Sequence, residues 1–178
     1  MMLAKICIMG ETSVGKTSLV RRFVDRSFDD VYLTTVGVKI SRKHCAAPGH
    51  LKDNADGIQL VLWDLEGGDL FGDVAASYVK GARAAIIVGD VTRPHTIEAL
   101  ERHTNRFLSV NPHGTVVLAL NKSDLDHDQG ILVPQALHGL DAVLTTFRTS
   151  ARTGEGVDEA FTAIAHHVLG ESADGSAT

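Results

Sequence analysis

Short apolar runs rich in β-branched residues alternate with segments of helical periodicity along the chain. We interpret six of these runs as strands, at Leu3–Met9, Val36–Cys45, Ile58–Asp64, Ala84–Asp90, Thr115–Leu120 and Ala142–Thr146. Between them, apolar residues recur four positions apart at Leu19 and Phe23, and a longer stripe runs from Val157 to Val168, which indicates amphipathic helices. This alternation predicts an α/β fold in which helices cover both faces of a parallel sheet.

Three segments depart from this alternation. The turn-rich stretch Ala46–Gly57 lies between two predicted strands, so we expect a long, exposed hairpin loop there. Two glycines and a proline within Gln129–Leu140 leave room for only a short or irregular helix. After Gly170 the residues are small and polar, so we expect one domain over residues 1–170 and a short flexible tail over residues 171–178.

Composition and charge narrow the class of protein. The chain has 178 residues, 44% hydrophobic and 22% charged, which is enough for one globular domain with a real core. Its formal net charge of -5 offers no basic surface, so no nucleic-acid partner is expected. Cys7 and Cys45 lack disulfide or metal-site spacing, and no apolar run reaches the ~18 residues of a transmembrane helix. We therefore expect a cytoplasmic protein without a transmembrane segment.

A glycine-rich loop follows the first predicted strand. The residues Gly10–Thr17, GETSVGKT, match the P-loop pattern GxxxxGK[ST] in its strand-loop-helix context, although a glycine loop before a helix can arise without that role. Backbone N–H groups of such a loop curl around phosphates, Lys16 reaches the β- and γ-phosphates, and the Thr17 hydroxyl ligates Mg²⁺. The helix that follows carries Arg21 and Arg22, which we interpret as a solvated face.

A second motif bears on which base is bound, since kinases, ATPases and GTPases share the P-loop. Asn121-Lys122-Ser123-Asp124 follows a predicted strand, at the edge where open α/β sheets bind ligands. The carboxylate of Asp124 can accept hydrogen bonds from the N1–H and exocyclic amine of guanine, a pair of donors that adenine lacks on that edge. Alone the motif is a common exposed turn, but together with the P-loop it favours guanine.

These residues resemble the small GTPases of the Ras superfamily, most closely the Rab-like branch. The resemblance covers roughly residues 3–170 and several motifs in the family's order: GETSVGKTSLVRRF, TVGV, WDLEGGDLF, SYVKGARAAIIVGDVT, NKSDL and TSARTGEGVDEAF. It implies a Ras-like G domain, a P-loop NTPase with a mostly parallel six-stranded sheet. It also implies a molecular switch that cycles between GTP and GDP states, with GTP/GDP and Mg²⁺ as cofactors.

The resemblance also implies a set of nucleotide-binding residues. Phe28 would pack edge-on against the guanine, although a core aromatic is the alternative; Lys122 would lie along the base, and the Ala151 N–H would meet the guanine O6. Ser150 would support the loop. The complete implied set is Gly10, Thr12, Ser13, Val14, Gly15, Lys16, Thr17, Ser18, Phe28, Thr35, Gly67, Asn121, Lys122, Asp124, Ser150, Ala151 and Arg152.

For the metal ion, the resemblance implies Thr17, Thr35 and Asp64 as the residues around Mg²⁺, with Thr34 as a rival to Thr35. Gly67 matches the glycine whose N–H senses the γ-phosphate. The alternatives for Asp64 and Gly67 are a strand-end acid and a turn glycine. The residues expected to act in hydrolysis are Lys16, Thr35, Gly67 and Glu66.

One departure from the family pattern concerns hydrolysis. Where the family has DTAGQE, this chain has Asp64-Leu65-Glu66-Gly67-Gly68-Asp69, so Gly68 occupies the position of the glutamine that orients the attacking water. Glycine has no side chain for that task, so we expect slow intrinsic hydrolysis. Glu66 could repel the γ-phosphate, orient water or face solvent. A hydrolysis-deficient, GTP-bound scaffold or interaction module is the alternative function.

Partners follow from the two switch segments that the resemblance implies. Switch I spans about Phe28 to Val38 and switch II about Asp64 to Val79, and effectors, exchange proteins and GTPase-activating proteins would bind there. The chain ends in Gly175-Ser176-Ala177-Thr178 without a prenylation motif, so lipid anchoring in the family's manner is not expected. This ending and the composition are typical of a prokaryotic Ras-like GTPase.

Overall fold

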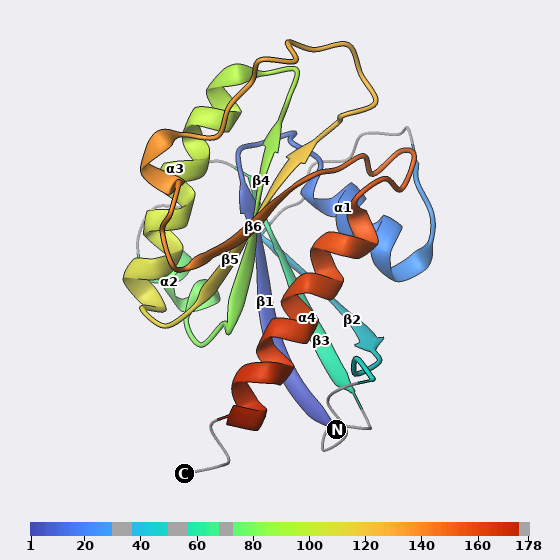
Figure 1. The fold of residues 1–178 in the computed structure, drawn as a ribbon, viewed down its shortest axis with the longest axis vertical. Helices are drawn as coiled ribbons and strands as arrows, with labels where there is room; N and C mark the ends of the chain where they lie inside the picture. The colour runs from blue at the N-terminus through green and yellow to red at the C-terminus, as the bar shows by residue number, and fades with distance from the viewer. Residues whose placement is uncertain (30–36, 50–56, 68–72, 175–178) are drawn as a thin grey trace.

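A six-stranded sheet forms the centre of the molecule in the computed structural model, which describes residues 1–29, 37–49, 57–67 and 73–174 (Figure 1). The strands are β1 Met2–Gly10, β2 Val38–Cys45, β3 Ile58–Leu65, β4 Ala84–Asp90, β5 Thr115–Asn121 and β6 Val143–Arg148. They lie in the order β2-β3-β1-β4-β5-β6. Only the β2–β3 pair is antiparallel, and every other neighbouring pair is parallel. The predicted mostly parallel six-stranded sheet is confirmed.

Helices cover both faces of this sheet, as the alternating pattern predicted. They are α1 Lys16–Asp25, α2 Asp73–Val79, α3 Pro94–Val110 and α4 Val157–Asp174, with the 3₁₀-helix η2 at Gln135–Leu137. α1 and α4 pack on one face, and α2 and α3 pack on the other (Figure 1). The single turn η2 is the short helix expected within residues 129–140.

Alternate residues of the central strands supply two separate cores because side chains of a strand point to opposite faces. From β1, Ile6 and Ile8 face the α1/α4 core, whereas Cys7 and Met9 face the α2/α3 core. β4 and β5 are buried along their whole length. Strands buried on both faces read as continuous apolar runs, which is why they are prominent in the sequence.

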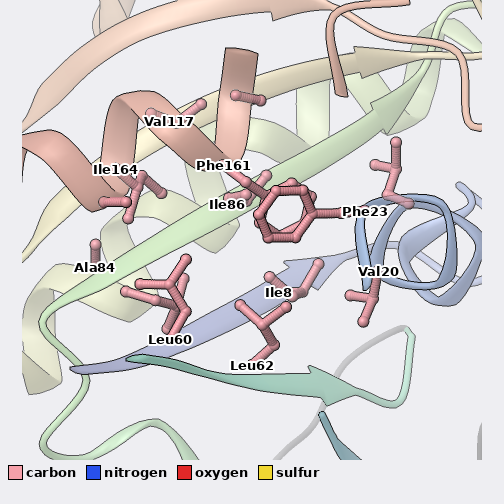
Figure 2. Close-up of a cluster of buried hydrophobic side chains, with 14 of the residues drawn as sticks. Ile8, Val20, Phe23, Leu60, Leu62, Ala84, Ile86, Val117, Phe161 and Ile164 are labelled. Atoms are coloured by element: carbon pink, nitrogen blue, oxygen red, sulfur yellow. The ribbon is translucent and has the colours of Figure 1, made fainter. Parts of the chain in front are cut away.

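The α1/α4 core contains a stacked pair of aromatic rings. Phe23 and Phe161 have ring centroids 4.2 Å apart and planes 5° from parallel, over the apolar side chains of the sheet (Figure 2). Phe161 is 1% exposed and Phe23 is 3% exposed. This pair joins the helix that begins at the glycine-rich loop to the last helix of the chain.

Element bounds differ from the predicted ones mainly at strand ends. β6 is Val143–Arg148, since its pairing with β5 continues to Leu120 opposite Arg148. β2 begins at Val38, and most of the predicted 46–57 hairpin loop, residues 50–56, lies outside the described residues. α4 continues past Gly170 to Asp174, where the Ser172 hydroxyl donates to the Val168 carbonyl. Residues 175–178 of the predicted tail lie outside the described part of the chain.

Candidate functional site

At two positions of the glycine-rich loop between β1 and α1, the backbone conformation and the surrounding atoms leave room only for glycine. Gly10 has φ +146°, and a Cβ there would lie 2.3 Å from the Val88 carbonyl oxygen. Gly15 has φ +99°, and a Cβ there would lie 2.3 Å from the Asn121 Nδ2. Both glycines of the GxxxxGK pattern are therefore required by close approach of β4 and β5.

Three successive carbonyl oxygens of this loop accept hydrogen bonds from side chains outside it. Both terminal nitrogens of Arg93 donate to the Thr12 oxygen at 3.1 Å. Lys122 Nζ donates to the Ser13 oxygen at 2.9 Å, and Asn121 Nδ2 donates to the Val14 oxygen at 2.9 Å. In a trans peptide the carbonyl and the following N–H point in opposite directions, so these bonds turn the N–H groups of residues 13–15 towards the other side of the loop.

Lys16 folds its ammonium back into the loop. It is 6% exposed, and Nζ donates to the Gly10 carbonyl at 3.1 Å and to the Glu11 carbonyl at 2.7 Å. Burial lowers the pKa of Lys16 to about 8, against the opposing attraction of Asp64 and Glu11. The attraction of these two carboxylates does not fully offset the loss of water around the Lys16 ammonium, so an anion such as phosphate would bind there favourably.

Thr17 and Asp64 form a pair beside Lys16. The Thr17 hydroxyl donates to Asp64 Oδ2 at 2.5 Å, and Asp64 is 1% exposed. Its other oxygen, Oδ1, has no hydrogen-bond partner among the described residues, and burial raises the pKa of Asp64. A hydroxyl and an unsatisfied carboxylate oxygen are hard donors that suit Mg²⁺, so these residues fit the cation. Thr35, with its rival Thr34, lies outside the described residues.

Gly67 lies directly against the glycine-rich loop. A Cβ on Gly67 would sit 2.5 Å from Thr12 Cα and 2.7 Å from Lys16 Nζ, so any side chain would force the two segments apart. The preceding residue joins two parts of the chain: Glu66 N donates to the Gly37 carbonyl at 2.8 Å, and Gly37 N donates to Glu66 Oε2 at 3.0 Å. The Glu66 carboxylate is therefore engaged rather than simply facing solvent. Gly68 lies outside the described residues.

Residues from β5 and from the loop after β6 assemble the other end of the site. Asn121 is 1% exposed, and its Oδ1 accepts from the Thr149 hydroxyl at 3.2 Å and from the Ala151 N–H at 3.3 Å. Ser150 is fully buried and donates to Asp124 Oδ1 at 2.6 Å. Ser150 thus orients the Asp124 carboxylate, which is consistent with a supporting role for this serine.

The other predicted nucleotide residues vary in their surroundings. Val14 is fully buried and Ser18 lies in α1. Phe28 is partly buried and packs against the α1/α4 core, so this contact agrees with the core-aromatic alternative. Arg152 is exposed, and its carbonyl oxygen accepts a hydrogen bond.

Two arginines at the site were missed by sequence reasoning. Arg22 does not lie on a solvated face of α1: its Nε donates to the Ala151 carbonyl at 2.7 Å, and its Nη2 donates to the Arg152 carbonyl. Arg93 holds the glycine-rich loop as described above. Arg22 lies within the stretch GETSVGKTSLVRRF and Arg93 directly follows GDVT, but neither stretch indicates which carbonyl its arginine would bond.

The glycine-rich loop lies at the carboxyl end of the central strand β1, and it holds a buried lysine beside a threonine-aspartate pair. The loop that follows β5 contacts it from the other side. This arrangement is that of a P-loop nucleotide-binding protein. Among the described helices, none combines the length and apolarity needed to span a bilayer.

Comparison with known proteins gives the family. A family model described as Ras family matches residues 5–170. The chain is 33% identical to the GTP-binding protein ypt5 of Schizosaccharomyces pombe over 164 residues, 90% of this chain and 75% of that protein. It is 31% identical to the Ras-related protein Rab-4A of Homo sapiens over 175 residues, 97% of this chain and 78% of that protein. It is also 31% identical to the Ras-related protein Rab-22A of Mus musculus over 166 residues, 92% and 82% of the two chains.

The chain belongs to the Ras family, and its fold is the Ras-like G domain. It is a Rab-like small GTPase, hence a guanine-nucleotide-binding switch, and family membership implies GTP hydrolysis.

Proposed function

We propose that this chain binds Mg²⁺ with GTP or GDP at the carboxyl edge of the sheet and hydrolyses GTP slowly without a partner. The observation that carries the proposal is the convergence of Lys16, Thr17 and Asp64, where a buried ammonium lies beside a carboxylate with one unsatisfied oxygen. A polyphosphate with its cation would satisfy both groups at once.

Each residue has a distinct role in this proposal. Lys16 binds the β- and γ-phosphates, and Gly67 contacts the γ-phosphate through its N–H. Thr17, Asp64 and Thr35 hold Mg²⁺, which when bound neutralises charge on the outer phosphates. Asp124 reads the guanine edge. The proposed nucleotide set is otherwise the one predicted from the sequence.

The slow rate rests on Gly68, which has no side chain to orient the attacking water. Glu66 is a carboxylate two positions before Gly68, and its Oε2 accepts a hydrogen bond from the Gly37 N–H. This bond ties the Glu66 side chain to the end of switch I, which restricts its freedom to orient the attacking water. We therefore expect an activating partner to supply the missing group, with effectors and exchange proteins binding at the same two switch segments.

A second function, a GTP-bound scaffold, has one observation in its favour. Two reciprocal hydrogen bonds between Glu66 and Gly37 link the start of switch II to the end of switch I. This link does not depend on GTP hydrolysis. Such a protein would hold its partner-binding segments together for as long as GTP stays bound.

A single-turnover assay separates the two functions. The protein is loaded with GTP and Mg²⁺, and GDP formation is followed beside a Gly68→Gln variant. Turnover at or above roughly 10⁻⁴ s⁻¹ in the unaltered protein would mean that another group, such as Glu66, positions the water. Slower turnover that the glutamine rescues supports the switch, whereas no turnover in either protein supports the scaffold.

Base recognition is tested separately by competition. GTP should displace bound GDP far more effectively than ATP does, and Asp124→Asn should reduce that discrimination. Unchanged selectivity in the variant would contradict the role of Asp124, and tight binding retained by Lys16→Ala would contradict the role of the P-loop.

A further inference from the structure

Arg93 holds a part of the glycine-rich loop that the two recognised motifs leave unsupported. Asn121 and Lys122, both from the base-recognition motif, bond the carbonyl oxygens of Val14 and Ser13. The next carbonyl back along the loop, that of Thr12, accepts two N–H groups from Arg93 at 3.1 Å each. Arg93 thus completes a row of three carbonyl contacts but comes from a different strand end.

The backbone of Arg93 is fixed before its side chain reaches out. Its N–H donates to the Asp90 carbonyl at 2.9 Å, and its own carbonyl accepts the Thr96 N–H at 2.9 Å and the Thr96 hydroxyl at 2.8 Å. Thr96 is 1% exposed, and Pro94 begins α3 immediately afterwards. A rigid turn fixes the point from which the side chain extends, so this arginine is well placed to position another group.

The contact acts on a strained peptide. Ser13 has φ +69°, a left-handed conformation that disfavours residues with a side chain. Two hydrogen bonds to the preceding carbonyl stabilise this peptide plane, and they direct the Ser13 N–H away from Arg93. The planar fork of an arginine can donate both bonds to one oxygen, whereas lysine presents a single ammonium without fixed geometry.

Thr12 lies at the end of the loop where the outer phosphates would bind. The Cβ position of Gly67 is within 3 Å of both the Thr12 backbone and Lys16 Nζ. The Thr12–Ser13 peptide is therefore a neighbour of the ammonium that the P-loop pattern assigns to the β- and γ-phosphates. Support for this peptide should affect the outer phosphates more than the base or the α-phosphate.

We propose that Arg93 is a positioning residue for the outer phosphates of the bound guanine nucleotide, acting through the Thr12 carbonyl. This inference rests on the proposed nucleotide-binding function. It requires no direct contact between Arg93 and the nucleotide.

The test compares nucleotides that differ in phosphate number. Dissociation constants for GMP, GDP and GTP are measured on the unaltered protein, Arg93→Ala, Arg93→Lys and the control Arg83→Ala. Arg83 is a suitable control because, like Arg93, it lies near a carboxylate: Arg83 is 3.7 Å from Glu171, and Arg93 is 4.0 Å from Asp90. Arg83 precedes β4 at the opposite end of that strand. Thermal unfolding of the nucleotide-free proteins shows whether any variant is simply less stable.

Arg93→Ala should weaken GDP and GTP binding about tenfold, which corresponds to about 1.4 kcal/mol, and GMP binding by less than about twofold. Arg93→Lys should fall between the two, and Arg83→Ala should match the unaltered protein. GDP binding by Arg93→Ala equal to that of the control would overturn the inference. So would an equal loss for GMP and GDP, because a general structural defect would not distinguish phosphate number.

Failure of the underlying function has a different signature. If the unaltered protein bound ADP as well as GDP, the guanine-nucleotide proposal itself would fall. If it bound GDP selectively but Arg93→Ala had no effect, only the role of Arg93 would be rejected. Should Arg93→Ala not fold, Arg93→Gln and Arg93→Lys provide the same comparison: losses for GDP that exceed those for GMP support the inference, and equal losses or none overturn it.

Discussion

Asp64 is expected to cost the protein stability when no cation is bound. The carboxylate is 1% exposed, Oδ2 accepts one hydrogen bond from Thr17, and Oδ1 has no partner among the described residues. Burial raises the pKa of Asp64 even though the Thr17 hydrogen bond and the attraction of Lys16 oppose it, so folding makes the charged form less favourable than it is in the unfolded chain. The carboxylate is thus suited to a bound cation rather than to the protein alone.

Asp64→Asn removes the charge and keeps an acceptor for Thr17. Leaving a buried polar atom unsatisfied costs about 1–3 kcal/mol, and more when the atom is charged, so we expect the nucleotide-free variant to gain about 1–2 kcal/mol. For a domain of this length, that corresponds to a rise in Tm of about 2–8 °C. The same change should abolish the increase in GDP affinity that Mg²⁺ produces in the unaltered protein.

The assay is thermal unfolding at pH 7 in the presence of a chelator, followed by GDP titration with and without Mg²⁺. Asp158→Asn serves as the control because it removes an exposed carboxylate that pairs with Arg26 at 2.5 Å. An exposed pair of this kind contributes about 0–1 kcal/mol, so no stabilisation is expected from the control. A lower Tm for Asp64→Asn without Mg²⁺ would refute the reasoning about buried charge, and an intact Mg²⁺ response would refute the role of Asp64 towards the cation.

Three further predictions concern the core, the base loop and pH. Phe161→Ala removes a ring stacked on Phe23 and should lower the free energy of unfolding by about 3–5 kcal/mol, as measured by urea denaturation. Arg22→Ala frees the Ala151 carbonyl and should speed GDP release several-fold in a fluorescent-nucleotide chase; an unchanged rate would show that the base loop holds itself in place. Burial lowers the pKa of His103, so the unfolded chain binds a proton that the folded protein resists, and stability should fall as pH drops below 6.5. His103→Gln should flatten this part of a Tm-against-pH profile, and an equally steep profile would contradict the assignment.

Local patterns were sufficient to predict the elements and the loop at Gly10–Thr17. The glycine spacing lies within eight residues and follows an apolar strand, so backbone geometry and position in the fold are both encoded nearby. Lys16, Thr17 and Asp64 converge as predicted because parallel strands end at the same edge of the sheet.

Contacts between distant side chains could not be predicted in the same way. Arg93 bonds a carbonyl 81 positions earlier, and Arg22 bonds one 129 positions later. An arginine on a helix face or in a turn has no spacing that distinguishes a buried contact from a solvated one, since its long side chain reaches several neighbours. The hydrogen bond between Glu66 and Gly37 could not be predicted either, because it depends on the pairing of β2 with β3.

The row of carbonyl contacts also has a consequence for how the protein acquires its ligand during synthesis. The glycine-rich loop is synthesised well before the side chains that hold it, those of Arg93, Asn121 and Lys122. At 5–20 residues per second, the loop waits for on the order of ten seconds before they emerge. The nascent chain should therefore capture nucleotide only after β5 has joined the sheet, so ligand capture would report that Asn121 and Lys122 have been synthesised and folded into place.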